Sequence, residues 1–124
     1  MNGRQFLDQV LTAALPSDEW KVIPFDDNPT VSELTVMFHR ASARALPEAP
    51  NGTWESTMTL YVLTPQQIGE AALDALDDAL DVVLMVLDGV DGLTWSEATY
   101  TTLSGTYPTF QITAQVRTQK EATI

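Results

Sequence analysis

The sequence predicts one α+β domain, a two-layer sandwich in which two helices cover a mainly antiparallel sheet of about five strands. Its 124 residues, 44% of them hydrophobic, match the size and composition of a single globular core, so residues 1–124 are expected to form one domain. Several short segments alternate apolar and polar residues, as strands do, and one long segment repeats its apolar residues at helical spacing. Their order is α-β-β-β-α-β-β.

The chain is expected to open with a helix from Asn2 to about Leu15, because its apolar residues recur along one helical face. Pro16 ends that helix, since proline cannot continue it. A short strand follows over Trp20–Phe25, before the turn-rich residues 26–29.

The next strand, Glu33–Leu46, is longer than its apolar pattern. Its core-type alternation stops after Phe38, and the same face is then expected to carry Arg40, Ser42 and Arg44. A strand that continues beyond its apolar residues indicates a β-hairpin arm that protrudes from the sheet.

Residues 47–52 have the composition of a turn, and the chain then returns through a strand over Trp54–Leu63. Two more strands are predicted over Leu93–Leu103 and Tyr107–Val116. The regular alternation in the last of them is typical of an antiparallel sheet with one solvated face.

Between these strand pairs, the sequence predicts a long helix over Thr64–Asp88. Thr64 and Gln67 form a capping box at its start, and apolar residues follow 3.6-residue spacing over Ile68–Leu87. Gly89 is placed to end the helix in a left-handed conformation.

The chain is strongly acidic, with 17 acidic and six basic residues and a formal net charge of −11. This balance disfavours phosphate binding, because a DNA-binding surface must supply cations. Thr64–Asp88 contains no lysine or arginine, and most of its acids share one helical face. Three interpretations fit this face: an ordinary solvated surface, a lumen wall that repels phosphate, or a contact for basic residues of a neighbouring subunit. The acidic surface comprises Glu70, Asp74, Asp77, Asp78 and Asp81.

Three apolar residues, Val82, Met85 and Val86, lie off the main stripe of the long helix. They indicate either a deeper core or a subunit interface. The arm carries two of the six basic residues, which fits either a solvated hairpin or a docking element for an acidic neighbour. The residues expected at a subunit or partner interface are Arg40, Arg44, Trp54, Val82, Met85 and Val86.

The residue inventory predicts no enzyme, no metal site and no cofactor. The chain has no cysteine and a single histidine, His39, whose alternation marks it as an ordinary strand residue. It contains no phosphate-binding glycine loop, nucleophile elbow or zinc-binding motif. The longest apolar run, Val82–Leu87, is far shorter than the roughly 20 residues of a bilayer span, so no membrane partner is expected.

The chain resembles the tail terminator, or tail-completion, family of long-tailed bacteriophages (siphoviruses), especially versions from phages of actinobacteria. The resemblance combines the order of elements and the long central hairpin with local phrases that span nearly the whole chain. These phrases are Phe6–Leu15, Leu34–Arg40, Leu60-Tyr61-Val62-Leu63-Thr64-Pro65, Ala71–Leu87, Leu93-Thr94-Trp95-Ser96-Glu97-Ala98 and the closing Tyr107–Val116 strand.

This resemblance implies a structural protein without catalytic residues. Such a protein forms a homo-oligomer, a hexameric ring that caps the tail tube protein, stops tube polymerisation and offers a surface to the head-tail connector protein. DNA passes through the lumen without specific binding. The expected location is the head-proximal end of the virion tail, and the host cytoplasm during assembly.

Two other functions fit the sequence. One is a neighbouring neck or head-closure connector protein, which would share a small α+β fold and ring assembly. The other is an acidic DNA-mimic inhibitor of a host nuclease, which the net charge allows, although the acids are concentrated on one predicted helix.

Overall fold

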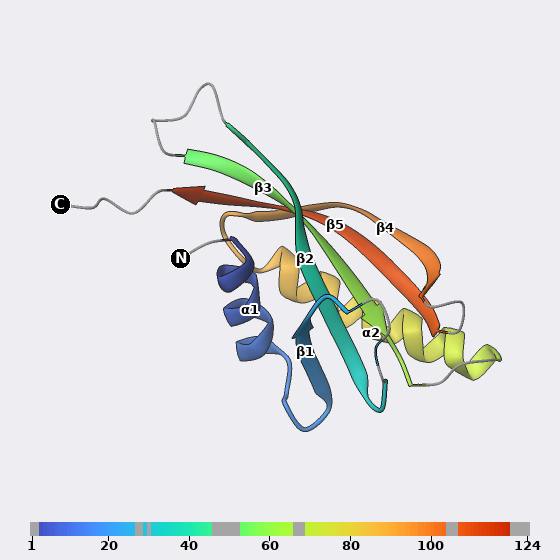
Figure 1. The fold of residues 1–124 in the computed structure, drawn as a ribbon. Coiled ribbons are helices and arrows are strands. Elements are labelled where there is room, and N and C mark those ends of the chain that lie inside the picture. The colour runs from blue at the N-terminus through green and yellow to red at the C-terminus, as the bar shows by residue number, and fades with distance from the viewer. Residues whose placement is uncertain are drawn as a thin grey trace.

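The structure is a computed structural model that describes residues 3–26, 29, 31–45, 53–65, 69–103 and 107–119. Within these residues it contains two helices and one five-stranded sheet, in the order α1-β1-β2-β3-α2-β4-β5, which confirms the predicted fold class (Figure 1). The predicted start of the first helix at Asn2, the turn over 47–52, and Gln67 and Ile68 of the long helix lie outside the described residues.

The elements lie close to their predicted positions. The helices are α1 (Gly3–Ala14) and α2 (Glu70–Asp88), and the strands are β1 (Trp20–Pro24), β2 (Leu34–Ala45), β3 (Thr53–Leu63), β4 (Leu93–Leu103) and β5 (Tyr107–Gln119). The last strand runs three residues beyond its predicted end at Val116.

The sheet is mixed, with the strand order β1-β2-β3-β5-β4. Strand β1 pairs in parallel with β2, so that Trp20 lies opposite Leu34, and the remaining pairs are antiparallel. Strand β1 is short, lies at an edge and ends at Pro24, a position where the missing N–H of proline is tolerated.

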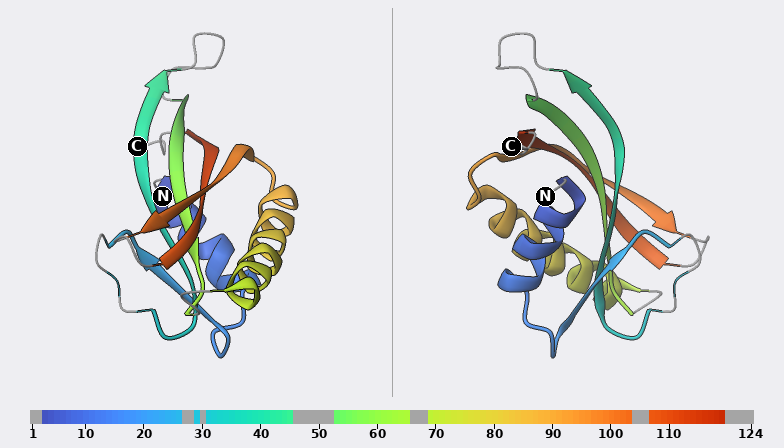
Figure 2. Two further views of the ribbon diagram at one scale, coloured as in Figure 1. Left: turned by 90° about the vertical axis from the view of Figure 1, so that its right-hand side faces the viewer. Right: turned by 60° about the vertical axis from the view of Figure 1, so that its left-hand side comes forward.

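Both helices pack on the same side of the sheet (Figure 2). Helix α1 buries Leu7 and Leu11 on one face, and Leu15, just beyond its end, is also buried. The residues that α2 buries share one face of that helix: Ala72, Leu76, Ala79, Val83 and Leu87. From the sheet, Val36, Phe38, Met58, Leu60, Val62, Ile112, Ala114 and Val116 complete this core.

The opposite side of the sheet, called here the outer face, is not solvated throughout, contrary to the expectation from alternation. Met37 and Leu63 are fully buried there and pack with Val31. Val31 belongs to the segment that links β1 to β2. Parallel strands require the chain to return to the end of the sheet at which the first strand began. The returning segment brings its own apolar residue against the outer face.

The ends of α2 differ from the prediction. The helix begins at Glu70 rather than Thr64, and Gly69 before it has φ 93°, a left-handed conformation that is incompatible with a continuous helix. At the other end, Gly89 has φ −86° and is not left-handed. Gly92 takes the positive φ, 82°, in the turn before β4.

Ser56 of β3 offers a test of the core. Its hydroxyl is fully buried and has no hydrogen-bond partner among the described residues. Because a buried polar group without a partner loses its hydration, we expect Ser56→Ala to raise the free energy of unfolding by about 1 kcal/mol in urea denaturation. A decrease of that size would show instead that the hydroxyl is hydrogen-bonded.

Candidate functional site

The protruding arm is three-stranded, not a two-stranded hairpin. We define it as Arg40–Ala45 of β2, Thr53–Glu55 of β3 and Arg117–Gln119 of β5, and the pairing of β3 with β5 continues to its tip. In Figure 1 the ends of β2 and β3 extend to the upper left, past both helices. Every residue of the β2 part is exposed, because β1 pairs with β2 only as far as Phe38.

A β-bulge divides the two arginines of the arm. Arg40 lies opposite Met58 on the helix side of the sheet, and the register then shifts before Ser42, which lies opposite Thr57. The extra residue turns the following side chains over, so Arg44 lies opposite Glu55 on the outer face. The prediction that Arg40, Ser42 and Arg44 share one face was therefore wrong.

The outer face of the arm carries a row of charges. Arg44 Nη2 lies 3.1 Å from Glu55 Oε1, and Arg44 Nε donates a hydrogen bond to the same oxygen. Arg117 of β5 lies opposite Glu55 on its other side in the sheet register. With Arg40 included, the described part of the arm holds three arginines and one acid, a positive excess on a chain of net charge −11.

The helix side of the arm is less polar. Ala43 lies opposite Ser56 and Ala45 opposite Trp54, which continues the face that begins with Arg40. Trp54 is half-buried, whereas both alanines are exposed. This face stands beyond the helices that cover the same side of the sheet further down (Figure 2).

The acidic surface of α2 lies on the side of the helix that faces away from the sheet. All five of its predicted members are exposed: Glu70, Asp74, Asp77, Asp78 and Asp81. Asp88 ends the same row and accepts a hydrogen bond of 2.8 Å from Trp95 Nε1, which ties the end of the helix to β4.

The three apolar residues that lie off the helical stripe have different environments. Val86 is half-buried and packs against the core. Val82 and Met85 are 42% and 74% exposed. Leu73, which sequence reasoning did not single out, is also 46% exposed. Helix α2 thus presents large apolar side chains to solvent beside its carboxylates.

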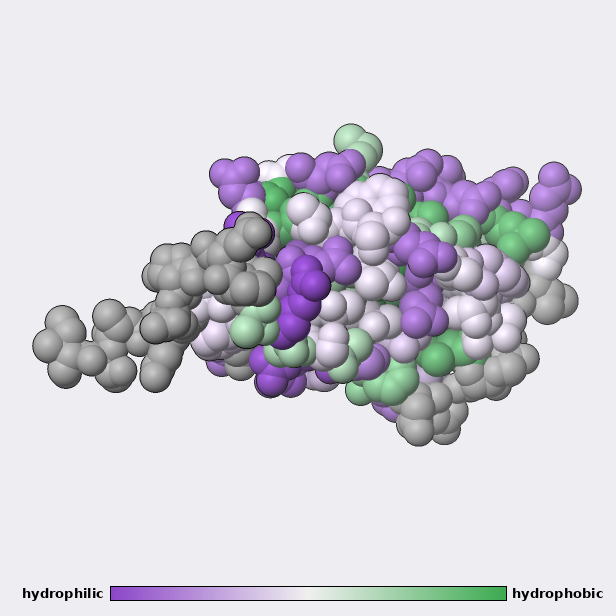
Figure 3. Space-filling view, turned by 90° about the horizontal axis from the view of Figure 1, so that it is seen from above, coloured by the Kyte–Doolittle hydropathy of each residue, from purple (hydrophilic) through white to green (hydrophobic). Residues whose placement is uncertain are grey.

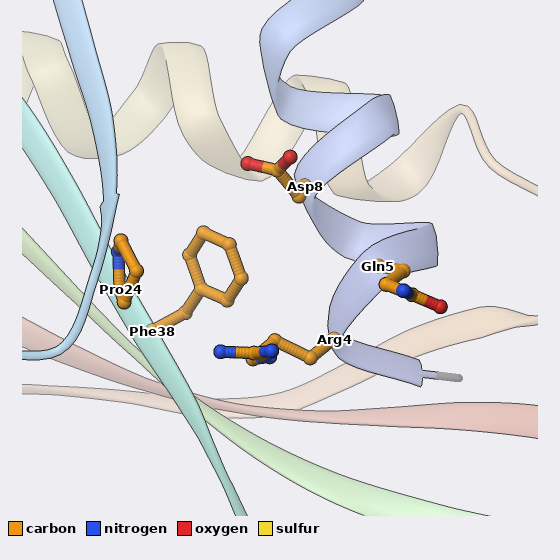
Figure 4. Close-up of a pocket in the computed structure, with 5 residues that line it drawn as sticks. All are labelled: Arg4, Gln5, Asp8, Pro24 and Phe38. Carbon is orange, nitrogen blue, oxygen red and sulfur yellow. The ribbon is translucent and has the colours of Figure 1, made fainter. Parts of the chain in front are cut away.

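A hollow between α1 and the β1–β2 edge was not predicted (Figure 4). It encloses roughly 230 Å³. The ring of Phe38 forms its inner wall, and Arg4 and Asp8 extend toward that ring from α1. Pro24 and Gln5 complete the lining. The sequence pattern did not predict this hollow, because the hollow depends on how α1 packs against β1 and β2.

A second unpredicted feature is an aromatic cluster on the outer face near the end of β1. The ring of Phe25 lies 5.0 Å from those of both His39 and Tyr61, measured between centroids. Tyr61 Oη and His39 Nε2 lie 3.5 Å apart, at the outer limit of a hydrogen bond. In the strand register Tyr61 is diagonal to His39, two residues beyond its direct partner Thr59. The position of Phe25 depends on the parallel pairing of β1.

This cluster leads to a pH-dependent prediction. Burial raises the pKa of the Tyr61 phenol above its ordinary value of about 10. The folded state therefore holds the Tyr61 proton more tightly than the unfolded state, and stability falls as the pH rises above about 10. We expect Tyr61→Phe to reduce this fall when the free energy of unfolding is measured between pH 8 and 11. Parallel curves for the two proteins would contradict this expectation.

Among the described residues, no group of three or more histidine, aspartate or glutamate side chains is placed to hold a metal ion. No helix in that part of the chain is long and apolar enough to cross a membrane.

No protein-family model matches the chain, and no curated protein sequence matches it. The arm and the outward side of α2 are the candidate functional surfaces, because they carry the exposed charges and apolar side chains described above.

Proposed function

We propose that the protein is a structural subunit of a phage tail, of the tail terminator kind. Several copies form a closed ring, with a hexamer expected, at the head-proximal end of the tail. The ring stops growth of the tail tube and offers a surface to the head-tail connector. DNA passes through its lumen.

The three-stranded arm is the observation that carries this proposal. Six consecutive residues of β2, Arg40–Ala45, are exposed on a strand whose outer edge β1 does not cover. A β-ribbon beyond its hydrophobic core gains little stability from its own chain, and an exposed edge strand invites unwanted pairing. A subunit that docks its arm on a neighbour removes both problems, which supports an assembly protein.

The charge distribution supports a channel through which DNA slides. With 17 acidic and six basic residues, the chain offers few cations to phosphates. Three of those basic residues lie in the arm, so most of the remaining surface is acidic or neutral. Figure 3, a view from above, shows small, separate hydrophobic areas among hydrophilic and neutral residues.

A DNA-mimic inhibitor has less support. The exposed acids of α2 form a single row on one helix, whereas a duplex presents two strands of phosphates. Met85, 74% exposed, lies within that row, where a mimic of phosphate would place charge. A connector protein of the neck would also assemble into a ring. It would bind other partners than a tail terminator does.

Native mass spectrometry of the purified protein at micromolar concentration, with and without Mg²⁺, tests the proposal. A discrete closed oligomer, expected to be a hexamer, would support it. A purified host nuclease that binds and is inhibited by a strictly monomeric chain would replace it with the mimic.

A further inference from the structure

The C-terminal half of α2 carries a compact surface of mixed character, called here the helix patch. It consists of Val82 and Met85 with Asp78 and Asp81. Asp78 precedes Asp81 by three residues and Val82 by four, and Met85 follows Val82 by three and Asp81 by four, so the four side chains form one continuous group on the helix surface. The two apolar members are 42% and 74% exposed, and both aspartates are exposed. An exposed apolar pair bordered by charge is typical of a protein contact.

The exposure of Met85 separates two interpretations of the acidic surface. A lumen wall that only repels phosphate gains nothing from a large apolar side chain held in water. A contact surface gains from it, because burial removes apolar area from solvent. The helix patch therefore fits a contact better than a channel wall.

The arm has the complementary character on its helix side. Arg40 lies there at the base of the arm, and Ala43, Ala45 and the half-buried Trp54 follow on the same side toward the tip. This face joins one cation to a low-polarity strip, as the helix patch joins carboxylates to an apolar pair. Within one molecule the two surfaces do not meet, because Val82 and Met85 remain exposed.

We infer that the helix patch is the docking site for the arm of a second copy of this chain. In this contact Arg40 of one subunit approaches Asp78 and Asp81 of the next, and the apolar parts of the two surfaces bury each other. The inference rests on the proposed function and names the interface that builds the ring. Because the two surfaces differ, the contact is heterologous, and its repetition closes a ring when the rotation per subunit allows.

Sedimentation velocity of the full-length chain over a range of concentrations tests this inference with one variant on each surface. Met85→Asp places a charge at the centre of the helix patch, and Arg40→Glu reverses the charge of the arm. Each is expected to weaken self-association by at least about tenfold, as loss of one central interface residue does. Both positions are exposed, so circular dichroism and thermal unfolding should match the original chain.

Two matched controls are available outside the proposed contact. Leu73→Asp makes the same kind of change on α2 at a residue that is 46% exposed. Lys21→Glu makes the same charge reversal at an exposed residue of β1. Both controls are expected to associate as the original chain does.

Mixing the two interface variants gives the sharpest result. The Met85→Asp chain keeps a working arm, and the Arg40→Glu chain keeps a working helix patch. An equimolar mixture is therefore expected to form one-to-one dimers that do not grow, at concentrations where each variant alone is monomeric.

The possible outcomes distinguish a wrong interface from the absence of ring assembly. If the original chain forms a closed oligomer that neither variant weakens, or that only one of them weakens, the inferred contact is wrong and the ring stands. If the original chain stays monomeric at every concentration, both the contact and ring formation in solution are overturned.

Discussion

Leu76→Ala is expected to lower the free energy of unfolding by about 2–5 kcal/mol, the usual effect of removing a fully buried leucine side chain. Leu76 has no exposed surface and lies on the face of α2 that packs against the sheet. The substitution leaves a cavity between the helix and β3, β4 and β5. Urea denaturation followed by far-ultraviolet circular dichroism measures the change.

Leu73 provides the matched control for this prediction. It lies three residues earlier in the same helix and is 46% exposed. Because surface substitutions rarely change stability by more than about 0.5 kcal/mol, Leu73→Ala should have little effect. Equal losses in the two variants would show that α2 is oriented differently on the sheet.

Gly92→Ala is expected to lower the free energy of unfolding by about 1–2 kcal/mol, because an alanine is strained at a left-handed φ. Gly92 has φ 82°, and an added Cβ would meet no atom within 4 Å, so the effect comes from the backbone alone. Its carbonyl also accepts a hydrogen bond from the Arg117 N–H, which joins this turn to β5. Urea denaturation again gives the change.

Gly89→Ala should have the opposite sign. Its φ is −86°, which any L-residue adopts, and a Cβ there would lie 3.7 Å from its nearest neighbours. Reduced entropy of the unfolded chain then raises the free energy of unfolding by about 0.4–1 kcal/mol. If both substitutions destabilise equally, the assignment of the left-handed position to Gly92 is incorrect.

The type and order of the elements could be predicted because periodicity reports burial directly. The apolar stripe of α2 and the alternation of β5 each identify one buried face, and both faces meet in the core. The first strand was found as well, but not its parallel direction. That direction depends on how the following segment crosses the outer face, and a five-residue strand carries no signal for it.

The details of the candidate site were harder to predict, for local reasons. The residues after Arg40 alternate alanine with serine and arginine, so no large apolar residue marks the side to which the bulge turns the strand. At the start of α2, the capping residues at Thr64 were a reasonable signal, but the left-handed Gly69 prevents the helix from continuing back to them. Predicting that Met85 is exposed would have required knowing how α2 is oriented on the sheet.

Electron microscopy of the purified protein tests the central claim, ring assembly around a channel, most directly. Rings of uniform size are expected, with a central opening, viewed along the ring axis, that is wide enough for duplex DNA. Monomers, or compact oligomers without an opening, at concentrations where the protein is otherwise folded would contradict it.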